Sequence, residues 1–210
     1  MHLTICRHGE TDFNVQKRLQ GWMDTPINSH GMEQARLLAK RLRWEKFDYA
    51  FCSTLRRTRE TFAEAMKYHK DVPVQFREEL REINLGIYEG LNAREIDAKY
   101  PGHWSRRVDS KYDFRHEGGE SYKSVDEGRV ASLMNEFREK YSSRNILVML
   151  HQGTAKLLIG SMLGLVPEEK MGISMPNDCI YFVEYRPHKT EVSCELLESG
   201  KKGGGILKNK

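Results

Sequence analysis

Two histidines and two arginines in this chain are residue types that metal-free phosphoryl transfer uses. They are Arg7 and His8 near the N-terminus, Arg57, and His151. Planar guanidinium groups match the oxygens of a phosphate, and an imidazole can serve as the nucleophile. A single histidine at the end of a strand is more often structural. The functional interpretation therefore depends on all four side chains meeting at one site.

Each of these residues follows a short run that predicts a β-strand. The runs are residues 3–6, 48–52 and 145–150, and the last is apolar throughout, as is typical of a strand buried on both faces. Ligands of open parallel sheets bind beyond the carboxyl ends of the strands. The four side chains should therefore meet at one edge of a sheet, in a site suited to an anion.

Helical periods alternate with these strands. Apolar residues recur at helical spacing in 31–44, 55–68, 121–141 and 154–164, and two final strands are expected at 179–185 and 191–196. Ser53 is expected to cap the helix that begins near residue 55. This alternation predicts an α/β fold, a three-layer α/β/α sandwich with a mostly parallel central sheet.

The length of the chain and one irregular stretch define its expected organisation. The 210 residues suit a single domain, which we place at 1–200. Residues 86–120 are rich in glycine and fit the alternation poorly, apart from a helical stretch near 93–100. We call them the roof segment, because they are expected to leave the sheet and to cover a pocket.

The basic character of the chain comes from its last ten residues. The four lysines of residues 201–210 account for the whole net charge of +4, so residues 1–200 are neutral. This distribution argues against a nucleic-acid-binding face. The glycine-rich tail is expected to be disordered.

Cellular location and membrane association are judged from the cysteines and the apolar runs. The four cysteines form no Cys-x-x-Cys pair, no signal peptide is recognised, and no apolar run approaches the length of a membrane span. A cytoplasmic protein without membrane contact is therefore expected. The sequence does not indicate an oligomeric state.

Five ordered motifs resemble the histidine phosphatase superfamily, in particular its phosphoglycerate mutase-like branch. They are Arg7-His8-Gly9-Glu10-Thr11 with Asn14, Leu19-Gln20-Gly21-Trp22, Ser53-x-Leu55-x-Arg57-Thr58, Leu80-x-Glu82 with Gly86-x-x-Glu89-Gly90, and Gly119-Glu120-Ser121 ahead of His151. A lone Arg-His-Gly would be weak evidence, but five blocks in order make a chance match improbable.

The resemblance implies a catalytic role for five side chains. His8 would attack phosphorus and become phosphohistidine, while Arg7 and Arg57 hold the phosphoryl oxygens and His151 adds a hydrogen bond. Glu82 would protonate the leaving oxygen and then deprotonate the attacking water. On composition alone, Glu82 is one acid in a charged surface run.

The resemblance also implies further contacts around the phosphate, from Asn14, Gln20 and Gly21. Gln152 stands where the family usually has glycine, and Gly153 follows one place later. The backbone N–H of Gln152 could still donate to phosphate, and its side chain could contact substrate. Glu89 is the other acid that could be mistaken for the proton donor, and we expect it to be mainly structural.

No metal and no cofactor are expected, because the remaining histidines and the cysteines have no metal-ligand spacing. The expected partner is a small phosphorylated metabolite. Four basic residues of the roof segment, Arg106, Arg107, Lys111 and Arg115, are either a solvated face or a device that selects an anionic substrate.

Three functions remain open at this point. A phosphatase is favoured, since residues 118–122 resemble the phosphatase members and the proline run of the mutases is absent. A cofactor-dependent phosphoglycerate mutase would use the same phosphohistidine, and Trp104 followed by Arg106 and Arg107 is an imperfect echo of its arginine pair. A phosphoester-binding protein without turnover is the third.

Overall fold

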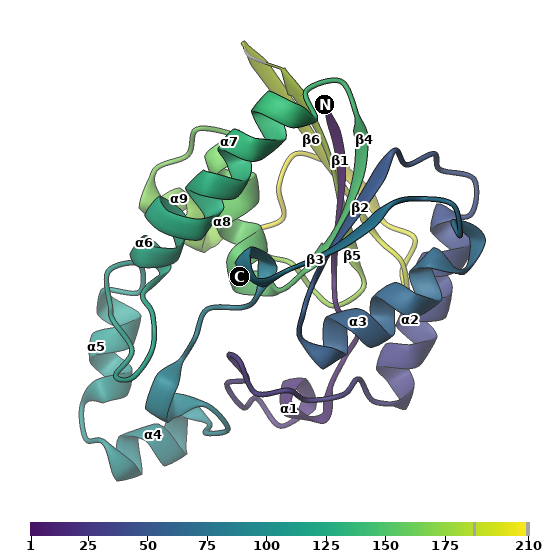
Figure 1. Cartoon of the computed structure of the whole chain (residues 1–210). Helices are drawn as coiled ribbons and strands as arrows, with labels where there is room; N and C mark the ends of the chain where they lie inside the picture. Colours follow the sequence, from purple (N-terminus) through teal and green to yellow (C-terminus); the bar gives the residue numbers. More distant parts are fainter. Residues whose placement is uncertain (187, 209–210) are drawn as a thin grey trace.

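The computed structural model describes residues 1–186 and 188–208 (Figure 1). Within them, seven strands form one sheet in the order β3-β2-β4-β1-β5-β6-β7. The strands are β1 His2–Arg7, β2 Tyr49–Ser53, β3 Val74–Arg77, β4 Asn145–Leu150, β5 Cys179–Arg186, β6 Lys189–Leu196 and β7 Lys202–Gly204. The first four in this order are parallel, and the last three run antiparallel to their neighbours. The predicted α/β fold with a mostly parallel centre is confirmed.

Helices cover both faces of the sheet, as the three-layer prediction requires (Figure 1). On one face lie α2 Ser29–Leu42 and α3 Arg56–Ala65, which a 3-10 turn, Met66–Tyr68, extends. On the other lie α6 Tyr122–Val125, the π-helical turn η4 Asp126–Val130, α7 Ala131–Lys140, α8 Gln152–Met162 and α9 Pro167–Gly172.

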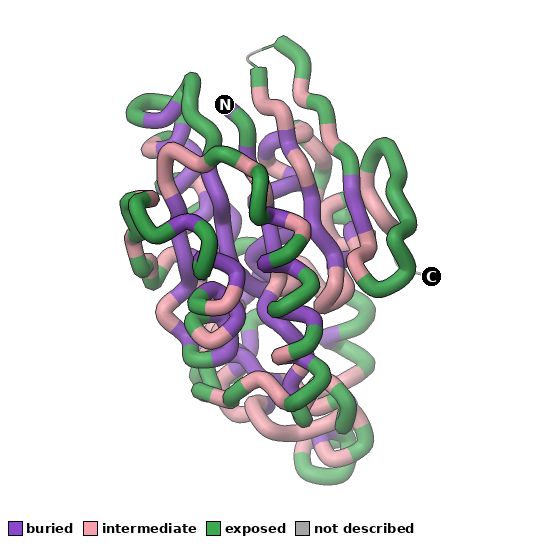
Figure 2. Tube along the Cα trace, turned by 90° about the vertical axis from the view of Figure 1, so that its right-hand side faces the viewer, coloured by how far each residue is buried: buried purple, intermediate pink, exposed green. Residues whose placement is uncertain are grey.

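Alternate residues of β4 enter two different hydrophobic cores. Ile146 and Val148 pack with the helices of the α7 and α8 face, whereas Leu147 and Met149 pack with those of the α2 and α3 face. All four are fully buried, and Figure 2 shows such buried strands through the middle of the molecule. Two-sided burial explains why residues 146–150 of this strand are all apolar.

The roof segment leaves the layers of the sheet. It contains the 3-10 turn η3 Gly86–Tyr88, the expected helix α4 Ala93–Lys99, and a second helix, α5 His103–Asp109, which the sequence pattern did not predict. In Figure 1, α4 and α5 lie together at the lower left, away from the strands. Two short elements complete the chain, α1 Asp12–Val15 and the 3-10 turn η2 Glu78–Leu80.

Two predictions about local structure are wrong. Ser53 does not cap α3, because it ends β2, and the cap position of α3 is Leu55, without a side-chain cap. The tail is not disordered over residues 201–208: β7 pairs with β6, and the backbone N–H of Leu207 donates to Tyr181 Oη at 2.9 Å. The apolar side chains of Ile206 and Leu207 anchor the tail on the core. Residues 209–210 lie outside the described part of the chain.

Candidate active site

A pocket of about 190 Å³ opens beyond the carboxyl ends of β1, β2 and β4. Its lining includes eight of the nine predicted site residues: Arg7, His8, Asn14, Gln20, Gly21, Arg57, Glu82 and Gln152. The ninth, His151, is fully buried behind the wall of the pocket. The structure therefore brings together residues that are up to 145 positions apart along the chain.

The imidazole of His8 is held with one nitrogen toward the pocket. His8 Nδ1 lies 2.8 Å from the carbonyl oxygen of Gly9, which can only accept, so Nδ1 carries the proton and Nε2 is left with its lone pair. Asn177 Nδ2 donates to the carbonyl oxygen of His8 at 2.9 Å and fixes the backbone. Burial, then Arg57 and Arg7, hold the pKa of His8 well below its ordinary value. The imidazole is therefore neutral, as a nucleophile must be.

Gly9 is required by a close approach of two backbone segments. A Cβ at this position would lie 2.4 Å from the carbonyl oxygen of Gly31 at the start of α2. The N–H of Gly9 donates to Thr61 Oγ1 of α3 at 2.9 Å. The turn after β1 is thus pressed against both helices of one face, which orients His8.

Of the two predicted arginines, Arg57 is buried and Arg7 is partly buried, and both are anchored on backbone carbonyls. Arg7 Nη1 donates to the carbonyl oxygen of Met175 at 2.7 Å, while its buried Nε has no hydrogen-bond partner. Arg57 donates to the carbonyl oxygens of Met23 and Gly21, each at 2.8 Å. Burial lowers the pKa of both arginines to about 10, so both remain cations at neutral pH. An orphaned N–H on a buried cation is the donor that a phosphate oxygen would satisfy.

His151 contacts Arg57 rather than the open pocket. Its Nδ1 accepts from Arg57 Nε at 3.2 Å, and its Nε2 lies 2.8 Å from Ser53 Oγ. Arginine can only donate, so the proton of the neutral ring is on Nε2 and both nitrogens are engaged. The direct hydrogen bond to phosphate expected of His151 is not available in this arrangement, in which His151 orients Arg57.

The Glu82 carboxylate lines the pocket and lies against the first turn of α8. It accepts from the backbone N–H of Gly153 at 3.0 Å and of Thr154 at 3.3 Å, and also from that of Ile83. A Cβ on Gly153 would lie 2.3 Å from Glu82 Oε1, so glycine is needed here for the carboxylate to approach the helix. Glu89, outside the lining, accepts instead from the N–H groups of Trp22 and Leu85 and so ties two loops together.

The remaining predicted residues also line the pocket, and two of their side chains have one group already engaged. Asn14 Oδ1 accepts from Thr11 in the capping box of α1, and Gln20 Oε1 accepts from Thr25 Oγ1 at 2.7 Å. Both side chains can therefore offer an NH₂ group to a ligand. The carbonyl of Gly21 holds Arg57, and Gln152 lines the pocket as the first residue of α8.

Further cations line the same pocket. Arg107 and Lys111 of the roof segment lie there with Arg18 and with Lys156, which is 2% exposed. Burial, then Lys111, lowers the pKa of Lys156 to about 7. The sequence motifs did not identify Lys156. The available signal was that it is the one charged residue in the sequence of α8.

Two hydrogen bonds in series, through the His116 ring, fix Arg107. Its Nε donates to His116 Nε2 at 3.2 Å, and His116 Nδ1 lies 2.6 Å from the carbonyl oxygen of Glu120. Burial lowers the pKa of His116 to about 4, so the ring is a neutral acceptor for the arginine. By contrast, Arg106 and Arg115, proposed with Arg107 as selectors of an anion, are not part of the lining.

The charge of the pocket is strongly positive. Arginine and lysine supply six lining residues, Arg7, Arg18, Arg57, Arg107, Lys111 and Lys156, and Glu82 is the one lining carboxylate. Arg7 and Arg57 follow β1 and β2, Arg107 and Lys111 belong to the roof segment, Lys156 belongs to α8, and Arg18 pairs with Glu95 at 2.6 Å. In the described part of the chain, three or more His, Cys, Asp or Glu side chains nowhere gather as they would around a metal ion. No helix there is long and apolar enough to cross a bilayer.

Comparison with known proteins connects this geometry to a family. The chain is 28% identical to fructose-2,6-bisphosphatase of Saccharomyces cerevisiae over 91% of its own length but only 41% of that protein's. It is 30% identical to 2,3-bisphosphoglycerate-dependent phosphoglycerate mutase 2 of Gloeobacter violaceus, over 80% of this chain and 78% of the mutase.

Its fold is similar to that of the alpha-ribazole phosphatase from Shigella flexneri, with a TM-score of 0.84 and 27% identity over 90% of this chain and 93% of the other. The family model for the histidine phosphatase superfamily, branch 1, matches residues 3–195. Related members are phosphatases or phosphoglycerate mutases, which is consistent with a phosphoryl-transfer enzyme. The chain therefore belongs to branch 1 of the histidine phosphatase superfamily.

Proposed function

We propose that this protein is a metal-independent phosphatase that hydrolyses small phosphomonoesters through a phosphohistidine on His8. The observation that carries this proposal is the environment of His8. Its neutral ring presents Nε2 to a pocket that the cations Arg7 and Arg57 line, and the buried Nε of Arg7 has no hydrogen-bond partner. An uncharged nucleophile beside preorganised cations is the arrangement that phosphoryl transfer without a metal requires.

In the first half-reaction, His8 Nε2 attacks phosphorus and a P–N bond forms as the P–O bond to the leaving group breaks. Arg7 and Arg57 stabilise the charge on the three equatorial oxygens. Glu82, as the carboxylic acid, gives its proton to the departing oxygen, so the product leaves as an alcohol. His151 keeps Arg57 in place through the 3.2 Å contact to its Nε.

In the second half-reaction, the Glu82 carboxylate takes a proton from water and the water oxygen attacks phosphorus. The P–N bond breaks, its electron pair returns to His8 Nε2, and inorganic phosphate is released. Glu82 ends the cycle protonated, ready for the next ester. One carboxyl group at the edge of the pocket thus serves both half-reactions.

Three further cations of the pocket favour a substrate with a second anionic group. Arg107, Lys111 and Lys156 line the pocket in addition to Arg7 and Arg57, and Lys156 is buried. Buried cations are costly unless an anion compensates them. We infer that the second anion, a phosphate or a carboxylate, binds here. The name of the yeast relative specifies such a bisphosphate ester.

A phosphoglycerate mutase is the second candidate, and two observations favour it. The Gloeobacter relative is a mutase of 30% identity, and the Arg107 guanidinium lies 5.0 Å from the ring of Trp104, as part of the imperfect arginine motif. The carboxylate of phosphoglycerate would pair with the same three cations. Faster interconversion of 2- and 3-phosphoglycerate than phosphate release would establish this function in place of hydrolysis.

The first test measures phosphate release from para-nitrophenyl phosphate in excess chelator. Wild type should turn over, His8→Ala should not, and the exposed-surface variant His30→Ala should match wild type. Wild type quenched in alkali should carry an alkali-stable, acid-labile phosphoryl group that His8→Ala lacks. Equal turnover by His8→Ala would reject the proposal. A folded wild type without turnover or isomerase activity would indicate a phosphoester-binding protein.

A further inference from the structure

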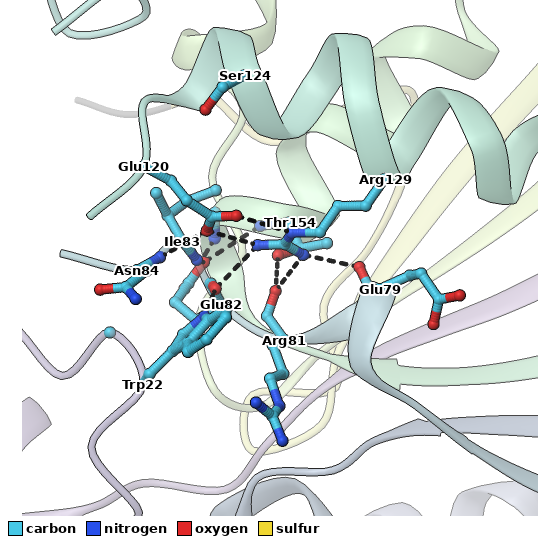
Figure 3. A network of polar contacts seen from close by, with 12 residues as sticks. Trp22, Glu79, Arg81, Glu82, Ile83, Asn84, Glu120, Ser124, Arg129 and Thr154 are labelled. Carbon is cyan, nitrogen blue, oxygen red and sulfur yellow. Dashed lines mark hydrogen bonds and ion pairs between the residues drawn. The ribbon is translucent and has the colours of Figure 1, made fainter. Parts of the chain in front are cut away.

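Arg129 contacts the backbone of the turn that carries Glu82 at three places (Figure 3). Its Nη1 donates to the carbonyl oxygens of Glu79 at 2.7 Å and Arg81 at 2.6 Å, and its Nη2 donates to that of Glu82 at 2.9 Å. Residues 79–82 lie between β3 and the roof segment, at the end of the short η2 turn. One guanidinium therefore joins three successive parts of this turn, two of whose carbonyls also accept from Thr154 Oγ1 of α8 (Arg81, 2.6 Å) and from Trp22 Nε1 (Glu82, 2.7 Å).

The guanidinium is itself fixed by a carboxylate. Glu120 Oε2 lies 3.2 Å from Arg129 Nη2 and also accepts from the backbone N–H of Asn84 at 2.8 Å, so it holds the chain just after Glu82. The Arg129 side chain is 15% exposed. Hydrogen bonds from a charged donor in such a partly desolvated place are stronger than neutral ones. The backbone is thus held on both sides of Glu82, by Arg129 at residues 79 and 81 and by Glu120 at residue 84.

The helix that carries Arg129 has an unusual turn at this point. Residues 126–130 form the π-helical turn η4 between α6 and α7. At its other end, Asp126 accepts from Lys170 Nζ at 2.6 Å and from Ser161 Oγ at 2.9 Å. Single π turns are uncommon and are frequent at functional sites. The turn is anchored through Asp126 while Arg129 is directed at the Glu82 segment.

We propose that Arg129 is a positioning residue for the general acid Glu82. Arg129 is not part of the pocket lining, so it acts through the backbone of residues 79–82. It holds the peptide of Glu82 at the distance from which the carboxylate reaches the N–H groups of Gly153 and Thr154. The inference rests on the proposed function, in which Glu82 protonates the leaving oxygen.

A purely structural arginine and a positioning arginine differ in their dependence on the leaving group. The para-nitrophenolate ion leaves without a proton, whereas the alkoxide of an aliphatic ester must be protonated as it departs. Because kcat/KM includes only the steps up to departure of the leaving group, it isolates the proton donation by Glu82. Loss of positioning should slow the aliphatic ester selectively.

The experiment compares kcat/KM for glycerol 3-phosphate and para-nitrophenyl phosphate in wild type, Arg129→Gln and Arg129→Lys. General acid catalysis contributes on the order of 10²- to 10⁴-fold. Arg129→Gln should therefore lose about 10²-fold on the glycerol ester and less than about 3-fold on the nitrophenyl ester. Arg129→Lys keeps the charge but not the fork of donors, so its loss on the glycerol ester should lie between those of wild type and Arg129→Gln. If the glutamine variant does not fold, the same comparison of the two esters is made with the lysine variant.

Arg77→Gln is the matched control, since Arg77 is 19% exposed and pairs with Glu79 and Glu136 but donates to none of the three carbonyls. It should change both substrates alike. Equal losses on both esters in the folded Arg129 variants, or no loss, would overturn the positioning role. That failure is distinct from failure of the proposed function, which would appear as turnover by His8→Ala.

Discussion

Glu82 and Gly153 are joined by a hydrogen bond of 3.0 Å from the backbone N–H of Gly153 to Glu82 Oε2, at the first turn of α8. The same helix begins directly after His151. The carboxylate proposed as the proton donor is therefore located by the helix that follows the second histidine. The glycine allows this approach, because it has no side chain to meet the carboxylate.

Gly153→Ala should displace the Glu82 carboxylate without unfolding the protein. The added Cβ would lie 2.3 Å from Glu82 Oε1, and the flexible side chain must yield. We expect kcat/KM for glycerol 3-phosphate to fall by roughly 10- to 100-fold, as for partial loss of a general acid. Gly172→Ala, where a Cβ would meet no atom within 4 Å, is the control. Unchanged kinetics in Gly153→Ala would show that Glu82 need not contact α8.

His116→Ala should weaken the binding of substrates with a second anionic group. His116 Nε2 accepts from Arg107 Nε at 3.2 Å. The variant removes this hydrogen bond, so the Arg107 side chain is no longer oriented in the pocket. We expect KM for 3-phosphoglycerate to rise about tenfold, the effect of one lost charge-assisted contact. KM for glycerol 3-phosphate, which lacks the carboxylate, should change little.

His103→Ala is the matched control for this prediction. His103 and His116 both pack against the ring of Tyr88, but His103 bonds the Tyr88 hydroxyl and not Arg107. Equal rises in KM for the two substrates in His116→Ala would mean that His116 supports the roof segment as a whole.

The sequence predicted the elements whose patterning is strong. Residues 146–150 are all apolar because both faces of β4 are buried there, and this strand was placed correctly at both ends. The edge strand β3 was missed, since two of its four residues, Val74 and Phe76, are exposed and the other two are only partly buried, so that pairing with β2 is what defines it. The ordered tail was missed because only two of its side chains, Ile206 and Leu207, are apolar, too few to form a pattern.

In the site, the sequence identified which residues take part but not how each of them acts. Motif spacing identified His8, Arg7 and Arg57, which meet in the pocket. The engagement of both nitrogens of His151 could not be read from the sequence, because it depends on the position of Arg57 Nε in space. Arg129 was also missed, since an arginine that donates to backbone carbonyls leaves no pattern in its partners' side chains.

The preference for a second anion should decline in alkaline solution. The pKa of Lys156 is lowered to about 7, so its positive charge is lost as the pH rises through that value. The ratio of kcat/KM for 3-phosphoglycerate to that for glycerol 3-phosphate should therefore fall between pH 6 and 9. The substrate carboxylate stays ionised over this range, and the phosphate titration is common to both esters.

Lys156→Arg provides the decisive comparison for this pH dependence, because arginine stays charged throughout. Its ratio should remain level to pH 9. A wild-type ratio that does not change with pH would remove Lys156 from the anion site, and a parallel fall in both proteins would assign the titration to another group.

Stability should decrease as the pH falls below about 6.5, the ordinary histidine value. Burial is the largest cause that lowers the pKa of His8, His151 and His116 in the folded protein. Below pH 6.5 the unfolded chain binds protons at these histidines while the folded protein does not, so the free energy of unfolding falls. The slope is at most about 1.4 kcal/mol per pH unit for each histidine.

Urea unfolding at pH 7.5, 6.0 and 5.0 measures this slope, because the midpoint concentration should fall while the m-value stays constant. The acids whose pKa is lowered, such as Glu79 and Glu136, contribute mainly below about pH 4.5 and lie outside this window. His116→Phe removes one of the three titrating rings and should reduce the slope by about one third, whatever its stability at pH 7.5. A midpoint that stays constant from pH 7.5 to 5.0 would mean that the buried imidazoles accept protons in the folded state, and His8 would then not be a neutral nucleophile at acid pH.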